Sequence, residues 1–286
     1  MYPTRFSYEA PRELDEALGL LRDHGDEAKV LAGGQSLVPL MKLRFAAPAL
    51  LVDINNLPGL DHHEVDDAGN LHVGALCRHV TLERSDLLRD TQPTMAAAAP
   101  LIADPIVRNR GTLVGSLCHA DPQGDWASVV LALDGSIVAA GPGGRRSIPA
   151  REFVLGPFQN ALAPDEIAVE AVIPAPRGTP SGGYLKLERR VGDFATVGVA
   201  VAVDTTPDGR VGRAGIALTG VGGATIECAD AAAALVGGPL TAETIEEAAT
   251  LAAAAARPKS DHRGSAAYKR HMVHTFVVRA LEGTTR

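Results

Sequence analysis

The chain has 286 residues, which is enough for a substantial core and favours two domains. Its net charge of −7, with 46% hydrophobic and 21% charged residues, is typical of a soluble globular protein and argues against a nucleic-acid-binding one. No apolar run approaches the roughly 18 to 20 residues that span a bilayer, and Met1–Arg5 lacks a signal-peptide core, so we expect a cytoplasmic protein without a transmembrane segment.

Three widely spaced cysteines, Cys77, Cys118 and Cys228, form no Cys-x-x-Cys pair. The chain by itself therefore predicts neither a zinc knuckle nor an iron–sulfur cluster. We expect each cysteine to be a reduced, small, buried hydrophobe. The sequence also lacks a phosphate-binding P-loop and the Gly-x-Ser-x-Gly elbow of hydrolases.

The first 55 residues predict a strand–helix–strand unit with a glycine turn. Apolar residues recur at helical spacing in Arg12–His24, while Lys29–Leu31 and Leu50–Ile54 are expected to be strands. The first strand runs into Ala32-Gly33-Gly34-Gln35-Ser36. A glycine pair is by itself typical of a plain turn, but its amides can also form a nest for an anion. The absence of Gly-x-Gly-x-x-Gly argues against a Rossmann dinucleotide site.

The middle of the chain carries a second candidate anion site. Asp61–Asp67 is rich in acids and histidines, but adjacent ligands on a flexible turn are poorly preorganised for a metal, so we expect a solvated turn. Farther on, Arg108-Asn109-Arg110-Gly111-Thr112-Leu113-Val114-Gly115-Ser116 offers guanidinium groups, amides and hydroxyls in a second turn. Ser116, His119 and Asp121 lie too close together in a loop to predict a catalytic triad.

The last half predicts a hairpin, a linker and a separate α+β domain. The linker is expected at Pro174–Pro180, and Thr244 and Glu247 have capping-box spacing in the helix that contains them. The expected strands are Ser136–Ala140, Arg145–Ile148, Glu166–Ile173, Thr196–Asp204 and Arg213–Thr219. The expected helices are Thr81–Arg89, Met95–Ile102, Trp126–Leu133, Ala229–Leu235, Thr241–Ala256 and Ser265–Leu281. We expect the C-terminal helices to cover one face of a sheet.

Taken together, the two glycine segments indicate shared binding of an extended anionic cofactor, because amides and Arg108 or Arg110 could neutralise a diphosphate. Both segments resemble the FAD motifs of the medium, flavin-carrying subunit of molybdenum hydroxylases. The similarity continues through His119–Pro122, Asp125, Lys186–Ala195 and Asp261–Arg270, and so covers nearly the whole chain. Within that family, the aerobic carbon monoxide dehydrogenases look closest.

The resemblance implies an α+β fold with an FAD-binding domain of the vanillyl-alcohol-oxidase (PCMH) type at residues 1–177, in subdomains of about 1–57 and 58–177. A C-terminal α+β domain of the CO dehydrogenase flavoprotein type would follow at 178–286. By position, the implied FAD-binding residues are Ala32, Gly33, Gly34, Gln35, Ser36, Ile102, Arg108, Arg110, Gly111, Thr112, Leu113, Val114, Gly115, Ser116, Asp125, Val169 and Lys186. No catalytic residue and no metal ligand is expected in this chain.

The resemblance also implies partners: a large subunit with molybdopterin cytosine dinucleotide and a small subunit with two [2Fe–2S] clusters, assembled as a dimer of heterotrimers. This chain would pass electrons through FAD to an acceptor such as quinone, with peripheral contact to a membrane quinone system at the inner face of the membrane.

The sequence departs from the family pattern at Gln35, Val114 and Ser116. Val114 stands in place of a glycine and motivates a second hypothesis, a flavin-free scaffold subunit. Two further alternatives stay open: a related hydroxylase acting on an N-heterocycle or aldehyde, and a free-standing flavin oxidase. The oxidase is disfavoured because no constellation resembles a substrate acid–base site.

Overall fold

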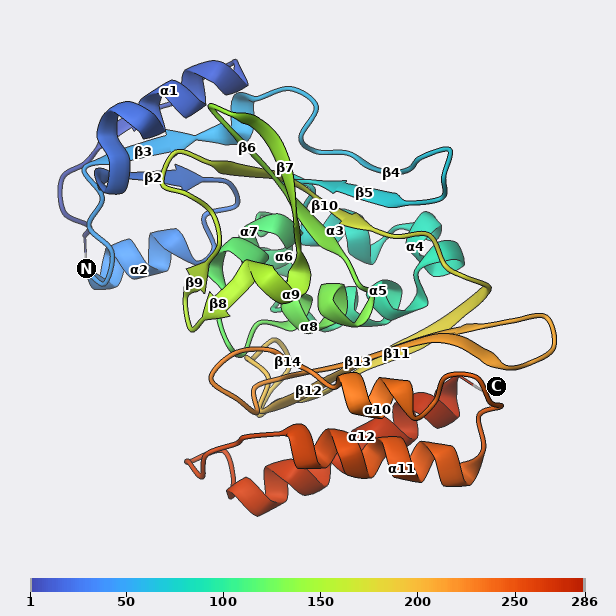
Figure 1. Ribbon diagram of the computed structural model, residues 1–286. Helices are drawn as coiled ribbons and strands as arrows, with labels where there is room; N and C mark the ends of the chain where they lie inside the picture. Colours follow the sequence, from blue (N-terminus) through green and yellow to red (C-terminus); the bar gives the residue numbers. More distant parts are fainter. Residues whose placement is uncertain (1, 285–286) are drawn as a thin grey trace.

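The computed structural model describes residues 2–284, and its first part is a small parallel sheet with two helices (Figure 1). The strand order is β1-β3-β2, and both strand pairs are parallel. The apolar stripe of α1 packs Ala17, Leu18 and Leu21 into the core, as the helical periodicity predicts. The elements are β1 (Ser7–Glu9), α1 (Leu14–His24), β2 (Ala28–Leu31), α2 (Leu37–Leu43) and β3 (Leu50–Asp53).

The second part is a five-stranded antiparallel sheet with short helices against it. Its strand order, β4-β5-β10-β6-β7, places β10 in the centre although it comes last in the chain. The strands are β4 (His63–Val65), β5 (Leu71–Gly74), β6 (Ser136–Gly141), β7 (Gly144–Pro149) and β10 (Ile167–Ile173). The helices are α3 (His79–Glu83), α4 (Asp86–Thr91), α5 (Pro93–Ala98), α6 (Pro105–Arg108), α7 (Leu113–His119), α8 (Asp125–Ala132) and α9 (Ala150–Phe153), and a small hairpin is formed by β8 (Val154–Gly156) and β9 (Gln159–Asn160).

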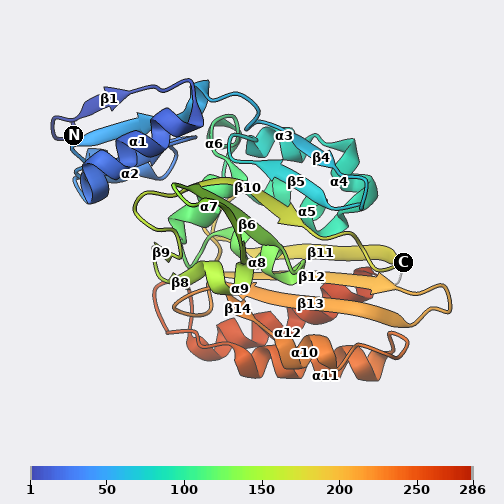
Figure 2. The same ribbon diagram turned by 45° about the horizontal axis from the view of Figure 1, so that its top comes forward.

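The third part is an antiparallel sheet with three helices on one face, as expected (Figure 2). Its other face packs against α5 and α8 of the second part. Thr94 donates a hydrogen bond to the carbonyl of Val201, and a Cβ at Gly215 would lie 1.8 Å from the Ala132 carbonyl oxygen. The elements are β11 (Thr179–Leu187), β12 (Val197–Thr205), β13 (Val211–Thr219), β14 (Ile226–Glu227), α10 (Ala229–Ala233), α11 (Ala242–Ala255) and α12 (Ala266–Gly283).

Several local expectations were wrong. His63–Val65 is a strand rather than part of a solvated turn, and the end of the expected linker, Thr179–Pro180, already belongs to β11. The capping box of α11 is formed by Thr241 and Thr244, one turn before the expected pair, because Thr241 is the residue that precedes the helix. Within residues 2–284, no helix has the length and apolar character needed to cross a bilayer.

A histidine–carboxylate cluster joins the β4–β5 hairpin to β10. The Nδ1 of His72 lies 3.2 Å from Glu170 Oε2, and its Nε2 lies 3.2 Å from Asp66 Oδ2. His62 also contacts Glu170, at 3.4 Å. Only the protonated imidazole donates from both nitrogens. Burial lowers the pKa of His72, but its hydrogen bonds to Asp66 and Glu170 outweigh burial and raise the pKa above its ordinary value of 6.5.

We therefore predict that His72 stabilises the fold most strongly in acid. A raised folded-state pKa gives a contribution that is complete below the unfolded pKa and is lost as pH rises through the folded pKa. Between about pH 6 and 8, the wild type should lose stability that a His72→Gln variant does not lose. Urea unfolding at several pH values measures this difference. The exposed His24→Gln serves as control and should follow the wild type. Parallel curves for wild type and His72→Gln would contradict the prediction.

Candidate functional site

The two glycine segments meet at one point of the fold. A Cβ at Gly33 would lie 2.2 Å from the carbonyl oxygen of Arg110 and 2.8 Å from the Cα of Gly111. No side chain fits at that distance, so Gly33 lets one main chain lie directly on the other. The structure thus brings together the segments that the sequence indicated as a pair.

The first segment offers a row of free amides. Gly34 has a φ of +72°, and the segment turns there between β2 and α2. The amides of Gly33, Gly34, Gln35 and Ser36 have no acceptor among the described residues. Such a row of consecutive N–H groups is the main-chain arrangement that binds an anion.

The second segment is the start of a helix, not the expected turn. Thr112 precedes α7, and its Oγ1 accepts a hydrogen bond from the amide of Gly115 at 3.1 Å. The amides of Leu113 and Val114 belong to the first helical turn, where no intrahelical acceptor exists. The Val114 side chain is buried and its φ is negative, so a glycine is not required at this position. The valine at position 114 therefore leaves the amide groups of this segment available to an anion.

A pocket of about 580 Å³ opens beside this junction. Lys42 and Arg110 supply positive charge at its wall, and Val38, Pro39 and Leu43 supply apolar surface. Free amides, two cations and an apolar wall together suit a nucleotide diphosphate. The resemblance to the first FAD motif extends to Lys42 and Leu43, whereas the sequence did not single out Val38 or Pro39, which lie about one helical turn after the glycine pair.

Arg108, expected to neutralise the anion, is directed elsewhere. Its Nε donates to Glu83 at 2.8 Å, and its Nη1 donates to the carbonyls of Ile102 and Ala103. The Arg108 side chain is 10% exposed, and its guanidinium holds the chain before α6 in place. Arg110 is therefore the arginine that can serve an anion here.

A buried ionic cluster joins the second and third parts of the structure. Lys186 Nζ lies 3.0 Å from Asp125 Oδ2, 3.0 Å from the Leu101 carbonyl and 3.5 Å from Glu188. Tyr184 donates to the other oxygen of Asp125 at 2.6 Å. Burial raises the pKa of Asp125, and the charge of Lys186 partly opposes that rise. Asp125, Lys186 and the segment at Ile102 are thus brought together, and none of the three is among the residues that line the pocket.

Val169 is placed differently from the other predicted residues. It is 1% exposed in the centre of β10, and its carbonyl accepts from the amide of Ala75. Its side chain belongs to the main hydrophobic core.

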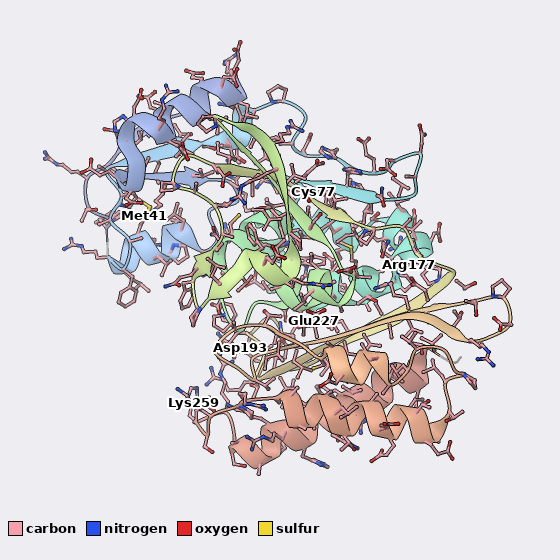
Figure 3. All side chains as sticks on the ribbon, viewed as in Figure 1. Met41, Cys77, Arg177, Asp193, Glu227 and Lys259 are labelled. Atoms are coloured by element: carbon pink, nitrogen blue, oxygen red, sulfur yellow. The ribbon has the colours of Figure 1, made fainter. Side chains whose placement is uncertain are left out.

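The loop after β11 is held by the segment that precedes α12. Arg263 donates to the carbonyl of Phe194 at 3.0 Å and lies 3.5 Å from Asp193. Figure 3 shows Asp193 and Lys259 at the same end of the third part. One carboxylate oxygen of Glu188 and one of Asp193 are buried without a hydrogen-bond partner among the described residues. Each of these oxygens has a cation at 3.5 Å instead, Lys186 for Glu188 and Arg189 for Asp193.

Three residues that the sequence did not indicate hold the glycine junction. Arg78 Nη1 donates to the carbonyl of Arg110 at 2.6 Å, and Arg78 Nη2 donates to Asn55 Oδ1. Asn55 Nδ2 donates to the carbonyl of Ala32 at 2.9 Å. His79 accepts from Trp126 through Nδ1, and burial lowers its pKa to about 4, so it is neutral.

The described residues contain no metal cluster of three or more His, Cys, Asp or Glu side chains. Cys77 and Cys228 are buried as expected, whereas Cys118 is half-buried, and all three are free. Ser116 lies in α7, while His119 faces the ring of Phe158 at 5.2 Å and is 4.0 Å from Asp121. These side chains form no nucleophile–base pair.

Known protein families and relatives match this chain over nearly its whole length. Residues 4–176 match the FAD binding domain in molybdopterin dehydrogenase, and residues 183–284 match the CO dehydrogenase flavoprotein C-terminal domain. The carbon monoxide dehydrogenase medium chain of Hydrogenophaga pseudoflava is 40% identical, over 98% of this chain and 97% of that one. The 6-hydroxypseudooxynicotine dehydrogenase complex subunit alpha of Paenarthrobacter nicotinovorans is 39% identical, over 98% of this chain and 95% of that one.

The solved structures give the same picture. A chain of the carbon monoxide dehydrogenase from H. pseudoflava, in a form that lacks the Mo-pyranopterin moiety of the molybdenum cofactor, matches with a TM-score of 0.94 and 41% identity. The match covers 100% of this chain and 99% of that chain.

We predict that Lys186 stabilises the contact between the second and third parts. A Lys186→Met variant leaves the carboxylates of Asp125 and Glu188 buried without their cation, which should cost about 3–5 kcal/mol in the free energy of unfolding. Urea unfolding measures the loss. Adding Asp125→Asn should restore part of it, because the second change removes one uncompensated charge. The exposed Lys29→Met is the matched control and should change stability by less than about 0.5 kcal/mol. Equal stability of Lys29→Met and Lys186→Met would contradict the role of Lys186.

Proposed function

Because the chain belongs to the FAD-binding medium subunits of the carbon monoxide dehydrogenase-like molybdenum hydroxylases, we propose that it transfers electrons through a bound FAD. The electrons would come from [2Fe–2S] clusters of a small partner subunit and leave to an external acceptor such as quinone. A large partner subunit with molybdopterin cytosine dinucleotide would oxidise the substrate. When bound, FAD supplies a group that can exchange electrons both singly and in pairs.

The observation that carries this proposal is the junction of two main-chain segments with unused amides. The amides of residues 33–36 and of residues 113–114 would hold the diphosphate, and Lys42 and Arg110 would balance its charge. Gln35, Gly111, Thr112, Gly115 and Ser116 belong to the same two segments. Ile102, Asp125 and Lys186 would serve the remaining parts of the cofactor. Arg110 is the better candidate for balancing the diphosphate charge, because Arg108 is paired with Glu83. Val169 is the weakest candidate for contact with FAD, because its side chain lies in the core.

The assembly is part of the proposal. We propose a dimer of heterotrimers, at the cytoplasmic side of the membrane and in peripheral contact with a quinone system. The division at residues 177/178 is proposed as well, and the two family matches, which end at 176 and begin at 183, support it.

The substrate of the whole complex has three candidates, of which the third, an aldehyde, is supported by the 33% identity to a glyceraldehyde dehydrogenase medium chain. Carbon monoxide is favoured by the 40% identity to a carbon monoxide dehydrogenase medium chain. An N-heterocycle is the second, because a chain of nearly equal identity belongs to a 6-hydroxypseudooxynicotine dehydrogenase complex. The flavin-free scaffold loses its motive, since Val114 leaves the amides of its helical turn available.

The proposed function predicts a flavoprotein that copurifies with its partners. The chain, tagged in its native host, should be yellow and contain one FAD, with molybdenum and iron in the copurified complex. Cofactor analysis and the visible spectrum measure this. Folded protein that lacks flavin and cannot be reconstituted would favour the scaffold. Substrate oxidation by the isolated chain would instead favour a free-standing oxidase. The large subunit's active-site loop would then indicate the substrate.

We also predict that Gly34→Val weakens FAD binding by about 10-fold to 100-fold, because a β-branched side chain resists the φ of +72° at this position. A Cβ at Gly34 would also lie 3.1 Å from the Leu31 side chain. Flavin retained after gel filtration measures the effect. Gly143→Val is the matched control, because a Cβ there meets nothing within 4 Å and its φ is not positive. Full flavin occupancy in Gly34→Val would count against the amide nest.

A further inference from the structure

We infer that Arg78 is a positioning residue that sets the separation of the two glycine segments and through it the affinity for FAD. The inference rests on the proposed function, since the ligand held between the segments is taken to be FAD. Arg78 does not line the pocket, so it would act through the main chain that it binds and not by touching the cofactor.

Arg78 completes a chain of hydrogen bonds from one segment to the other. Its Nη1 donates to the Arg110 carbonyl, the group immediately before Gly111. Its Nη2 donates to Asn55 Oδ1, and Asn55 Nδ2 donates to the Ala32 carbonyl, the group immediately before Gly33. Two side chains therefore connect the carbonyls that precede the two glycines.

The end at Asn55 is anchored in the parallel sheet. The Asn55 amide donates to Asp53 Oδ1 at 2.9 Å, and Tyr8 donates to Asp53 Oδ2 at 2.5 Å. Asp53 is the last residue of β3 and is paired with Leu31 of β2, one residue before Ala32. The side-chain amide of Asn55 thus has a fixed position relative to the first glycine segment.

The end at Arg78 is anchored on the second glycine segment. Arg78 forms an antiparallel bridge with Thr112, and the His79 amide donates to the Gly111 carbonyl at 2.9 Å. The His79 ring fills the space beside Gly111, where a Cβ would lie 2.7 Å from it. The backbone of Arg78 therefore moves with the second segment, while its guanidinium is connected to the first segment through Asn55.

Arg78 and Gly33 act on the same atom. The Arg110 carbonyl oxygen that accepts from Arg78 is the atom that a Cβ at Gly33 would meet at 2.2 Å. Arg78 holds this oxygen in place, and the missing side chain at Gly33 leaves room for it. A planar guanidinium suits the task, because its donors can bind two acceptors in fixed directions at once. Without it, the two sets of amides lose the spacing at which both reach one diphosphate.

The first experiment measures FAD affinity and stability separately. Flavin-free chain is prepared for wild type, Arg78→Met, Arg78→Lys and the exposed Arg84→Met, and is titrated with FAD while flavin fluorescence is followed. We expect Arg78→Met to bind FAD roughly 10-fold to 100-fold more weakly. Arg78→Lys, which keeps a donor for one carbonyl, should lie between it and the wild type. Arg84→Met should match the wild type. Urea unfolding confirms that each variant is folded during the titration.

A double-mutant cycle separates positioning from general stabilisation. Gly33→Ala forces a Cβ against the Arg110 carbonyl, so it should weaken FAD binding strongly when Arg78 holds that carbonyl and much less in Arg78→Met. Additive effects on affinity would overturn the inference and leave Arg78 a merely structural residue. Wild-type affinity in Arg78→Met would overturn it too. A wild type that binds no FAD would refute the proposed function itself, so the two failures are distinguishable.

Discussion

The close approach of two main chains at Gly33 is the constraint on which the site depends. Residues 32–36 come from the parallel sheet and residues 110–116 from the second part, so neither part contains the site alone. The glycine removes the side chain that would keep them apart, and Arg78 with Asn55 fixes the resulting distance. Correct docking of the two parts and formation of the site are therefore one event.

A second junction follows a different physical rule. At the glycine junction a guanidinium binds neutral carbonyl groups, whereas the contact of β11 with α8 pairs the opposite charges of Lys186 and Asp125. Buried charges are strong determinants of geometry because each must keep its partner. Lys186 also reaches the Leu101 carbonyl, so the chain before α6 is located from the third part. Polar contacts thus connect the first part to the second and the second to the third.

The sequence predicted the elements with strong periodicity and the local chemistry of the two glycine segments. The α1 helix, the central strands and the helices of the third part are where they were expected, because apolar residues recur there at one clear period. Their glycines, hydroxyl groups and arginines also indicated that residues 32–36 and 112–116 act together, and the family resemblance named the ligand as FAD.

The rest depended on tertiary contacts that no local pattern encodes. Arg108 and Arg110 look equivalent in the sequence, yet only the fold places Glu83 beside Arg108. Arg78 and Asn55 lie 23 positions apart, and their pairing exists only after two sheets dock. Val114 stands where the family pattern has a glycine, but helix α7 begins one residue earlier, so the backbone at this position does not require a glycine. Side-chain direction, not residue type, decided these cases.

The contact of the third part's sheet with α5 and α8 also affects how the chain folds during synthesis. The Ala132 carbonyl is covered by Gly215, and Thr94 donates to the carbonyl of Val201. Gly215 and Val201 both lie far downstream in the sequence. During synthesis, α5 and α8 emerge from the ribosome well before β12 and β13, so their apolar surfaces stay open for that interval. Strands β5 and β6 likewise lack their common neighbour until β10 has been synthesised. The nascent chain therefore exposes apolar surface until most of its length has been translated. A chaperone that recognises apolar surface would bind the chain during this interval.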